Sequence, residues 1–202
     1  MKIATMAQRS PEWFELKRGK IGGTNFGQVI SGKKNMLIYD LLNERLSSWI
    51  DHTDDYVSDD MQFGIDNEPV ARELYIKQSG IQFDEVGCIL SDFSGIHLAS
   101  PDGLNQERGI VLEIKCSRNG AKHLKRHFEG VDSEHLPQIK NYFAVSDEVK
   151  EVHFVSYCPD RFERPIIVYI FTPDMFADID KARAEIKNIE AKLNVMEQAF
   201  RF

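Results

Sequence analysis

Residues 110–116, IVLEIKC, constrain the fold more than any other part of this sequence. Five of the seven residues are apolar, which predicts a strand whose faces are largely buried. Glu113 and Lys115 interrupt the apolar run two positions apart, so their side chains leave the same face. Their Cα atoms would lie roughly 6.6 Å apart. The apolar neighbours would bury the strand and hold the two charged groups rigidly.

A turn ten residues earlier supplies a third charged group. Pro101 and Gly103 flank Asp102 and place it at the mouth of a hairpin. Two carboxylates can hold Mg²⁺, which prefers oxygen ligands and can polarise a phosphodiester and activate a bound water. Lys115 could orient or deprotonate that water, or neutralise charge on the phosphate. Asp-Gly is also an ordinary turn and Glu-x-Lys an ordinary exposed face, so these residues alone leave both interpretations open.

The remaining chain alternates between two kinds of periodicity. Apolar residues at helical spacing predict helices over residues 36–50, 63–78, 119–129, 134–145 and from 173 onward. Alternating or continuous apolar runs predict strands over residues 81–90, 95–100, 110–116, 151–158 and 165–171. No repeat or linker divides the chain, so we expect a single domain over 1–202. This order predicts an α/β (α+β) domain of three layers, with a mixed central sheet flanked by helices.

Charge is unevenly distributed. The formal net charge of −7 argues mildly against a nucleic-acid-binding protein. However, residues 51–60, predicted as a solvated loop, contain five Asp, whereas residues 115–127 contain five Lys or Arg and no acid. An acidic outer surface with a basic channel is compatible with both facts. His123 and His127 lie within the basic segment without a third metal ligand, so we interpret them as part of a partly basic surface rather than as a metal site.

Cysteine usage and hydropathy indicate the compartment. Three cysteines, far apart and odd in number, predict no disulfide framework and favour a reducing cytoplasm. No run approaches the roughly 20 apolar residues that a membrane span requires, and the first residues lack the apolar core of a signal peptide. We therefore expect a cytoplasmic protein with no membrane partner.

The charged residues also form a familiar pattern. Pro101-Asp102 followed by Glu113-Ile114-Lys115 resembles the PD-(D/E)XK nuclease core, which has a restriction-endonuclease-like fold. More specifically, the sequence resembles the lambda-exonuclease-like (YqaJ-type) alkaline exonucleases of phages. Supporting segments occur in the family's order: residues 13–24 (WFELKRGKIGGT), residues 64–71 (GIDNEPVA), the Ser100 that precedes Pro101, and residues 138–142 (QIKNY).

The resemblance implies a role for each matching residue of the catalytic centre. The implied Mg²⁺ ligands, for which Mn²⁺ would substitute, are Asp102, Glu113, the carbonyl of Ile114 and Glu68. Lys115 would be the catalytic lysine, Gln138 would hold the water or the metal shell, and Tyr142 would support the site. Spacing alone would instead make Glu68 a solvated helix residue, and ordinary helix packing is as good an account of Tyr142.

The resemblance also implies a pocket for a 5′-phosphate, formed by a basic residue and hydroxyls. Thr24 and Ser100 match the hydroxyl positions. Lys17 stands where the family has arginine, with Arg18 beside it, so either could supply the cation. Trp13 is as well explained by core packing as by stacking on a base.

Taken together, the resemblance implies a Mg²⁺-dependent 5′→3′ exonuclease acting on double-stranded DNA ends. It would release 5′-mononucleotides and leave 3′ single-stranded tails for a phage single-strand annealing protein, in the cytoplasm of a bacterial host. The family suggests a homotrimeric ring around the DNA. The alternatives are a restriction-type or junction-cleaving endonuclease, which would cut closed circles, and a non-catalytic DNA-end-binding module, which would form no product. A Cas4-like relative would need four cysteines for its iron–sulfur cluster.

Overall fold

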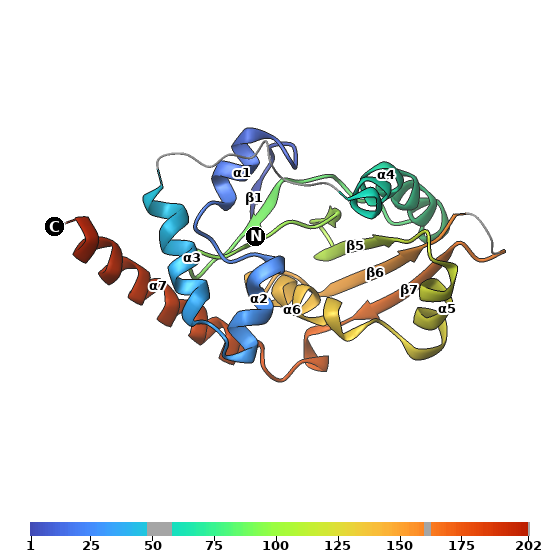
Figure 1. Ribbon diagram of the computed structural model, residues 1–202. Helices are drawn as coiled ribbons and strands as arrows, with labels where there is room; N and C mark the ends of the chain where they lie inside the picture. Colours follow the sequence, from blue (N-terminus) through green and yellow to red (C-terminus); the bar gives the residue numbers. More distant parts are fainter. Residues whose placement is uncertain (48–57, 160–162, 202) are drawn as a thin grey trace.

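A computed structural model describes residues 1–47, 58–159 and 163–201 (Figure 1). The strands are β1 (Lys2–Ala4), β2 (Cys88–Leu90), β3 (Leu98–Ala99), β4 (Gly103–Asn105), β5 (Ile110–Cys116), β6 (Glu151–Tyr157) and β7 (Ile166–Phe171). The α-helices are α1 (Pro11–Lys17), α2 (Gly23–Ser31), α3 (Asn35–Leu46), α4 (Asp59–Ser79), α5 (Gly120–Glu129), α6 (Leu136–Val145) and α7 (Ile179–Arg201). Short 3₁₀ turns precede α6 and α7, at Ser133–His135 and Pro173–Met175.

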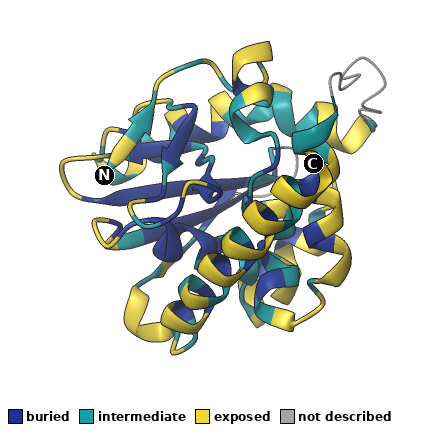
Figure 2. Ribbon diagram, turned by 90° about the vertical axis from the view of Figure 1, so that its left-hand side faces the viewer, coloured by how far each residue is buried: buried dark blue, intermediate teal, exposed yellow. Residues whose placement is uncertain are grey.

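The central sheet is mixed, as expected. Its strand order is β4-β5-β6-β7, with β5 and β6 parallel and the other neighbours antiparallel. One face packs against α4, where Leu112 and Ile114 share a cluster with Ala71. The opposite face packs against α6, where Val111 shares a cluster with Ile139. Figure 2 shows these strands buried between helices whose outer faces are exposed. The expected sheet flanked by helices is therefore confirmed.

The helix ends follow local sequence signals. Helix α4 begins after Ser58, whose side chain accepts a hydrogen bond from the Met61 N–H, and ends at Gly80, which adopts a φ of 71°. Asn119 caps α5 in the same way, accepting from the N–H groups of the first turn. These signals explain why both helices were predicted within a few residues of their observed bounds.

Other elements differ from the prediction because tertiary contacts define them. The predicted strand over 81–90 is a strand only at β2; earlier, Asp84 forms an isolated bridge to Leu104 of β4. Strand β4 itself lies inside a segment predicted to be a turn. The C-terminal helix begins at Ile179 rather than at Pro173. The sequence analysis assigned no element to the first 35 residues, which form β1, α1 and α2.

The structure corrects the interpretation of His123. Its side chain is buried, with Nδ1 3.0 Å from Ser156 Oγ and Nε2 3.2 Å from the Arg164 carbonyl oxygen. The face of α5 that carries His123 packs on β6, so that, of the two histidines, only His127 is exposed. Trp49 and most of the Asp-rich stretch (residues 51–57) lie outside the described residues. Within the described ranges, no helix has the length and apolar character needed to cross a membrane.

Candidate active site

Glu113 lies at the centre of the site. It is on β5, and only 1% of the residue is exposed. The ammonium of Lys115 donates a hydrogen bond to Oε1. On the other oxygen, Oε2, the Gln138 amide donates over 2.8 Å and the Tyr142 hydroxyl lies 2.5 Å away. Both carboxylate oxygens are therefore held in place, as a buried charge requires.

Asp102 is fastened to the same strand by its backbone and its side chain. Its N–H donates to the Leu112 carbonyl over 3.0 Å, and its Oδ2 accepts from the Ile114 N–H over 2.6 Å. Burial raises the pKa of Asp102 well above its ordinary value, and the nearby carboxylates of Glu113 and Glu68 raise it further. Asp102 in the turn and Glu113 on the strand, with ten residues between them in sequence, are thus brought together.

Lys115 remains a cation in this setting. Burial alone would lower its pKa, but the charges of Glu113 and Asp102 outweigh burial and raise the pKa above its ordinary value. An ammonium so stabilised neutralises negative charge more readily than it removes a proton from water. Of the roles considered for Lys115, the electrostatic one fits this geometry best.

Glu68 reaches the site from α4 and is held by arginines. Arg72 donates to its Oε1 over 2.8 Å, and Arg9 lies 3.9 Å from Oε2. Burial raises the pKa of Glu68, although Arg72 and Arg9 oppose that shift. Arg72 also donates from Nε to the Asp102 carbonyl over 2.8 Å, which links the helix to the turn. Sequence analysis missed Arg72; its position four residues after Glu68 on one helix was the available signal.

We call Asp102, Glu113 and Glu68 the carboxylate cluster, and their oxygens are of the kind that a hard divalent cation takes as ligands. The side chains of the cluster offer only oxygen ligands. Burial is the main cause of the raised pKa values of Asp102 and Glu68. A bound cation would stabilise their ionised carboxylates. The predicted contribution of the Ile114 carbonyl stays a prediction.

A second acidic group is a poor metal site. Ligand atoms of Asp132, Glu134 and His135 lie within 4.8 Å of one another. However, Arg126 already donates to Asp132 over 2.9 Å. Burial and the nearby charges of Lys115 and Arg126 lower the pKa of His135 to about 4. Arg126 and Lys125 already pair with the Asp132 carboxylate, so a cation would have to displace them.

A cavity of about 160 Å³ lies beside Glu113, and we call it the Lys17 pocket. It is lined by Gln8, Trp13, Lys17, Gly22, Gly23, Thr24, Leu98, Ser100, Gln138, Asn141 and Tyr142. The first turn of α2, which includes Gly23 and Thr24, presents backbone N–H groups and the positive end of the helix dipole. Together with the Lys17 ammonium and the hydroxyls of Thr24 and Ser100, this lining suits a phosphate.

Lys17 lines this pocket, whereas Arg18 does not. The Lys17 Nζ lies 3.6 Å from the centre of the Trp13 ring, and burial lowers the Lys17 pKa. Arg18 donates from Nε to the Glu44 carbonyl over 2.6 Å and lines a neighbouring cavity on the α3 side, which Lys17 and Thr24 also line. Trp13 is itself packed, with its ring N–H donating to the Gly87 carbonyl over 3.0 Å. The Trp13 ring is therefore held in place, and the Lys17 ammonium packs over it.

Tyr142 joins the pocket to the carboxylate cluster. Its hydroxyl lies 2.5 Å from Glu113 Oε2 and 3.0 Å from the Ser100 carbonyl oxygen. Both neighbours are hydrogen-bond acceptors, so Tyr142 can contact them favourably only while its hydroxyl keeps its proton. Burial and the nearby carboxylates raise the Tyr142 pKa well above its usual range. Gln138 lines the pocket and also donates to Glu113.

The sequence pattern of the YqaJ-like viral recombinase domain matches residues 12–148. This match covers more than half of the chain. The chain belongs to the YqaJ-like viral recombinase family. The family resemblance inferred from the motifs is thereby confirmed, and the matched range spans both the carboxylate cluster and most of the Lys17 pocket.

Solved structures agree with this membership. The chain is similar to the alkaline exonuclease LHK-Exo of Laribacter hongkongensis, with 25% identity, a TM-score of 0.80, and coverage of 95% of this chain and 96% of that one. LHK-Exo in complex with dAMP gives a TM-score of 0.74 at 24% identity, covering 95% and 98%. A phage-related exonuclease from Haemophilus somnus 129PT shares the fold at 13% identity, with a TM-score of 0.60 and coverage of 92% and 98%. No curated protein is significantly similar.

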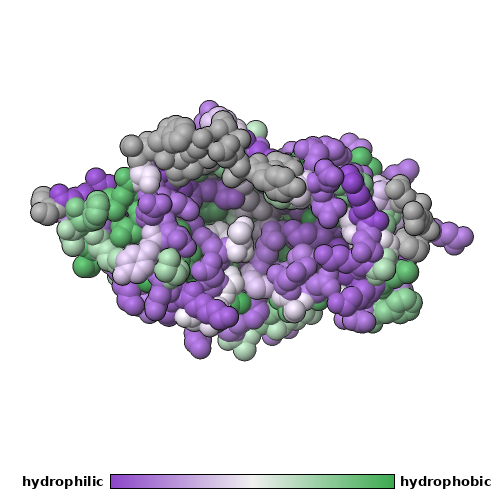
Figure 3. Space-filling view, in the orientation of Figure 1, coloured by the Kyte–Doolittle hydropathy of each residue, from purple (hydrophilic) through white to green (hydrophobic). Residues whose placement is uncertain are grey.

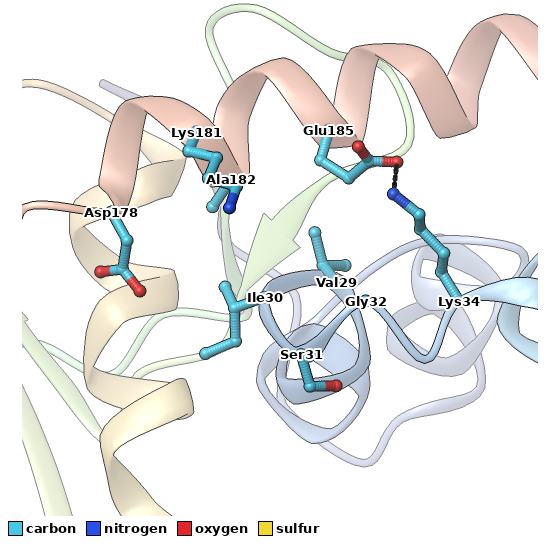
Figure 4. Close-up of a pocket in the computed structure, with 9 residues that line it drawn as sticks. All are labelled: Val29, Ile30, Ser31, Gly32, Lys34, Asp178, Lys181, Ala182 and Glu185. Atoms are coloured by element: carbon cyan, nitrogen blue, oxygen red, sulfur yellow. Dashed lines mark ion pairs between the residues drawn. The ribbon is translucent and has the colours of Figure 1, made fainter.

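Another cavity of this YqaJ-like domain, about 300 Å³, lies between α2 and α7 (Figure 4). Its charged residues include Lys34 and Glu185, which form an ion pair at 2.5 Å, and Asp178, which pairs with Lys140 at 2.7 Å. These pairs leave its charges balanced. None of the predicted site residues lines it.

The surface of the YqaJ-like domain is mainly hydrophilic on the face shown in Figure 3. Hydrophobic residues gather instead at the left, over the C-terminal part of α7, and at the lower right, near α5. Among the exposed apolar residues are Phe128 of α5 and Phe200 of α7. The face between these ends therefore suits a polar ligand better than an apolar one.

Proposed function

We propose that this YqaJ-family protein is a Mg²⁺-dependent 5′→3′ exonuclease that degrades one strand of duplex DNA from its end. It would release 5′-mononucleotides and leave a 3′ single-stranded tail. The single observation that carries the proposal is the junction at Tyr142, which joins a carboxylate cluster fit for a divalent cation to a pocket fit for a phosphate. A terminal phosphate held in that pocket would bring a nearby phosphodiester to the carboxylates.

The protein's own residues account for most of the chemistry. Asp102 and Glu113, with Glu68, would hold the metal, which supplies Lewis acidity and an activated water. Lys115, kept as a cation by Glu113, would stabilise the charge that develops on the attacked phosphate. Tyr142 and Gln138 would hold the Glu113 carboxylate in its orientation.

The Lys17 pocket would set the direction of digestion. Lys17 and the α2 N-terminus would bind the 5′-phosphate, with Thr24 and Ser100 donating hydroxyl hydrogen bonds. A 3′ end carries no phosphate to fill this pocket. The direction of digestion would therefore follow from the end of the strand that carries the phosphate.

Relatives support this assignment. LHK-Exo is an alkaline exonuclease, and it has been solved with a bound mononucleotide, dAMP. By analogy, we propose that this chain works as a single exonuclease domain, as a homotrimeric ring on DNA, and that it feeds a single-strand annealing protein in phage recombination. Mn²⁺ should replace Mg²⁺, because both are hard cations that accept oxygen ligands.

Digestion of end-labelled DNA tests the proposal. Linear duplex labelled at the 5′ or the 3′ end is incubated with and without Mg²⁺, beside a covalently closed circle. We expect early release of 5′-labelled mononucleotide, only with Mg²⁺ and only from linear DNA. Cutting of the closed circle would instead identify an endonuclease, and absence of any product would leave a DNA-end-binding module.

A further inference from the structure

A second cavity, of about 470 Å³, also borders the carboxylate cluster, and we call it the Arg9 cavity. Asp102 and Glu68 line it, whereas Ser100 lines the Lys17 pocket. The segment from Ser100 to Asp102 thus runs between the two. Gln8 lines both cavities, and its amide donates to the Pro101 carbonyl over 2.7 Å. A strand that fills the Lys17 pocket and passes the carboxylates would continue into the Arg9 cavity.

The backbone at Arg9 is strained. The Ser10 N–H donates to the Ala7 carbonyl over 3.3 Å, which closes a turn with Arg9 in its third position at a φ of 65°. That position favours Gly or Asn, and Arg9 is the non-glycine residue with positive φ in the described part of the chain. Strain of this kind is typically maintained at sites where the side chain has a function.

The Arg9 side chain is available for a ligand. Half of it (51%) is exposed, and its contact to Glu68 is long, at 3.9 Å. Arg72, by contrast, is buried and already bound to Glu68 and to the Asp102 carbonyl. Three carboxylates and two guanidinium groups line the cavity, from Asp102, Glu68, Glu85, Arg9 and Arg72. A divalent cation on the carboxylates would reverse its net charge from negative to positive, so the loaded cavity would attract an anion.

We propose that the Arg9 cavity binds a backbone phosphate of the digested strand, on the other side of the scissile bond from the Lys17 pocket. Arg9 is the residue that contacts this phosphate. The inference rests on the proposed nuclease function, and it adds a second anchoring point for the strand. With a phosphate held on each side, the scissile bond is fixed relative to the carboxylates.

Arg9→Gly separates function from folding, because glycine relieves the backbone strain while it removes the charge. Binding to a 5′-phosphorylated duplex is measured by fluorescence anisotropy over a KCl series, with Ca²⁺ replacing Mg²⁺. We expect a melting temperature equal to or above that of the wild type, affinity weaker by about tenfold, and a slope of log K against log [KCl] reduced by about one. Arg9→Lys keeps a cation and should keep the slope.

Lys192→Ala is the matched control, since Lys192 is an exposed cation on α7. It should leave the slope unchanged. An unchanged slope and affinity in Arg9→Gly would overturn the inference, as would a lower melting temperature with an unchanged slope. Digestion by the wild type is scored separately. If the wild type digests DNA while Arg9→Gly keeps its slope, only the Arg9 assignment fails. If the slope falls but the wild type releases no nucleotide, only the exonuclease assignment fails.

Discussion

The carboxylate cluster and the Lys17 pocket lie side by side, but they are built in different ways. In the cluster, Glu113 and Lys115 come from one strand, and Asp102 is fixed to that strand by hydrogen bonds. The pocket is assembled from α1, the start of α2, β3 and α6, which are brought together only in the folded chain. The cluster is buried around Glu113, whereas Thr24 in the pocket is exposed.

This difference separates two functions. Rigid, buried charges suit chemistry, because they cost no reorganisation when the transition state forms. A more open pocket suits recognition of a group that must enter and leave at every cycle. Changes in the cluster should therefore reduce the rate of cleavage, and changes in the pocket should alter which ends are used.

The largest effect is expected from Asp102→Asn, which removes a proposed metal ligand. We expect cleavage to fall by about 10³-fold or more, since a catalytic metal contributes several kcal/mol. Because burial and neighbouring carboxylates raise the pKa of Asp102, removing its charge should also raise the melting temperature in EDTA, by about 2–4 °C. Digestion rates over a Mg²⁺ titration and thermal melts test both parts. A variant with the wild-type Mg²⁺ requirement would argue against a ligand role for Asp102.

Lys115→Ala should come next. We expect kcat to fall by about 10²–10³-fold with DNA binding in Ca²⁺ unchanged, because the lost charge acts in the transition state. Glu113 keeps the Gln138 amide and the Tyr142 hydroxyl, so the variant should fold. Single-turnover digestion and anisotropy measure the two quantities. Near-normal rates would contradict the catalytic assignment.

A smaller, selective effect is expected in the pocket. Lys17→Ala should reduce the preference for 5′-phosphate over 5′-hydroxyl ends by about tenfold, because a charge-assisted hydrogen bond is lost. Arg18→Ala is the matched control and should keep the preference, since its guanidinium binds the Glu44 carbonyl. The ratio of kcat/KM for the two ends is the measurement. If Arg18→Ala rather than Lys17→Ala abolished the preference, the pocket assignment would be wrong.

The smallest effect concerns stability behind the pocket. His97 is buried, with Nε2 2.7 Å from the Asn141 Oδ1, and Asn141 lines the pocket. Burial, with a smaller contribution from the charge of Arg183, lowers the pKa of His97 to about 4, against 6.5 in an unfolded chain. Below pH 6.5, His97 binds a proton in the unfolded chain but stays neutral in the folded protein. The free energy of unfolding therefore decreases as pH falls from 6.5 to 4. By pH 5 the contribution of His97 to this loss should be about 2 kcal/mol.

Urea unfolding at pH 7 and pH 5 measures this loss. His97→Gln should be less stable at pH 7 but should show a smaller decrease between the two pH values. His127→Gln, at an exposed position, should retain the full decrease. An equal decrease in the His97→Gln variant would show that other groups cause the acid sensitivity.

Particular residues show why some of the site could be predicted. Glu113 and Lys115 share a strand face, which the two-residue period of a strand makes readable from sequence. Glu68 and Tyr142 could not be placed by periodicity, because a helix position gives no information on the partner that the side chain meets. The ordered family motifs supplied that information. Arg9 and Gln8 escaped notice because their contacts join segments far apart in the chain. Arg72 pairs with Glu68 one helical turn away, but its contact with Asp102 also joins distant segments.

By itself, the sequence determined the buried strand β5, the charged pair on one of its faces, the helices with clear caps, and the family. Tertiary structure decided the rest: the separate three-stranded sheet β1-β2-β3, the short strand β4 within a predicted turn, the burial of His123, and the hydrogen bond from Arg18 to the Glu44 carbonyl. The physical reason is the distance along the chain over which each effect acts. Periodicity and capping act within a few residues, whereas burial and hydrogen bonds between distant segments exist only after the chain has folded.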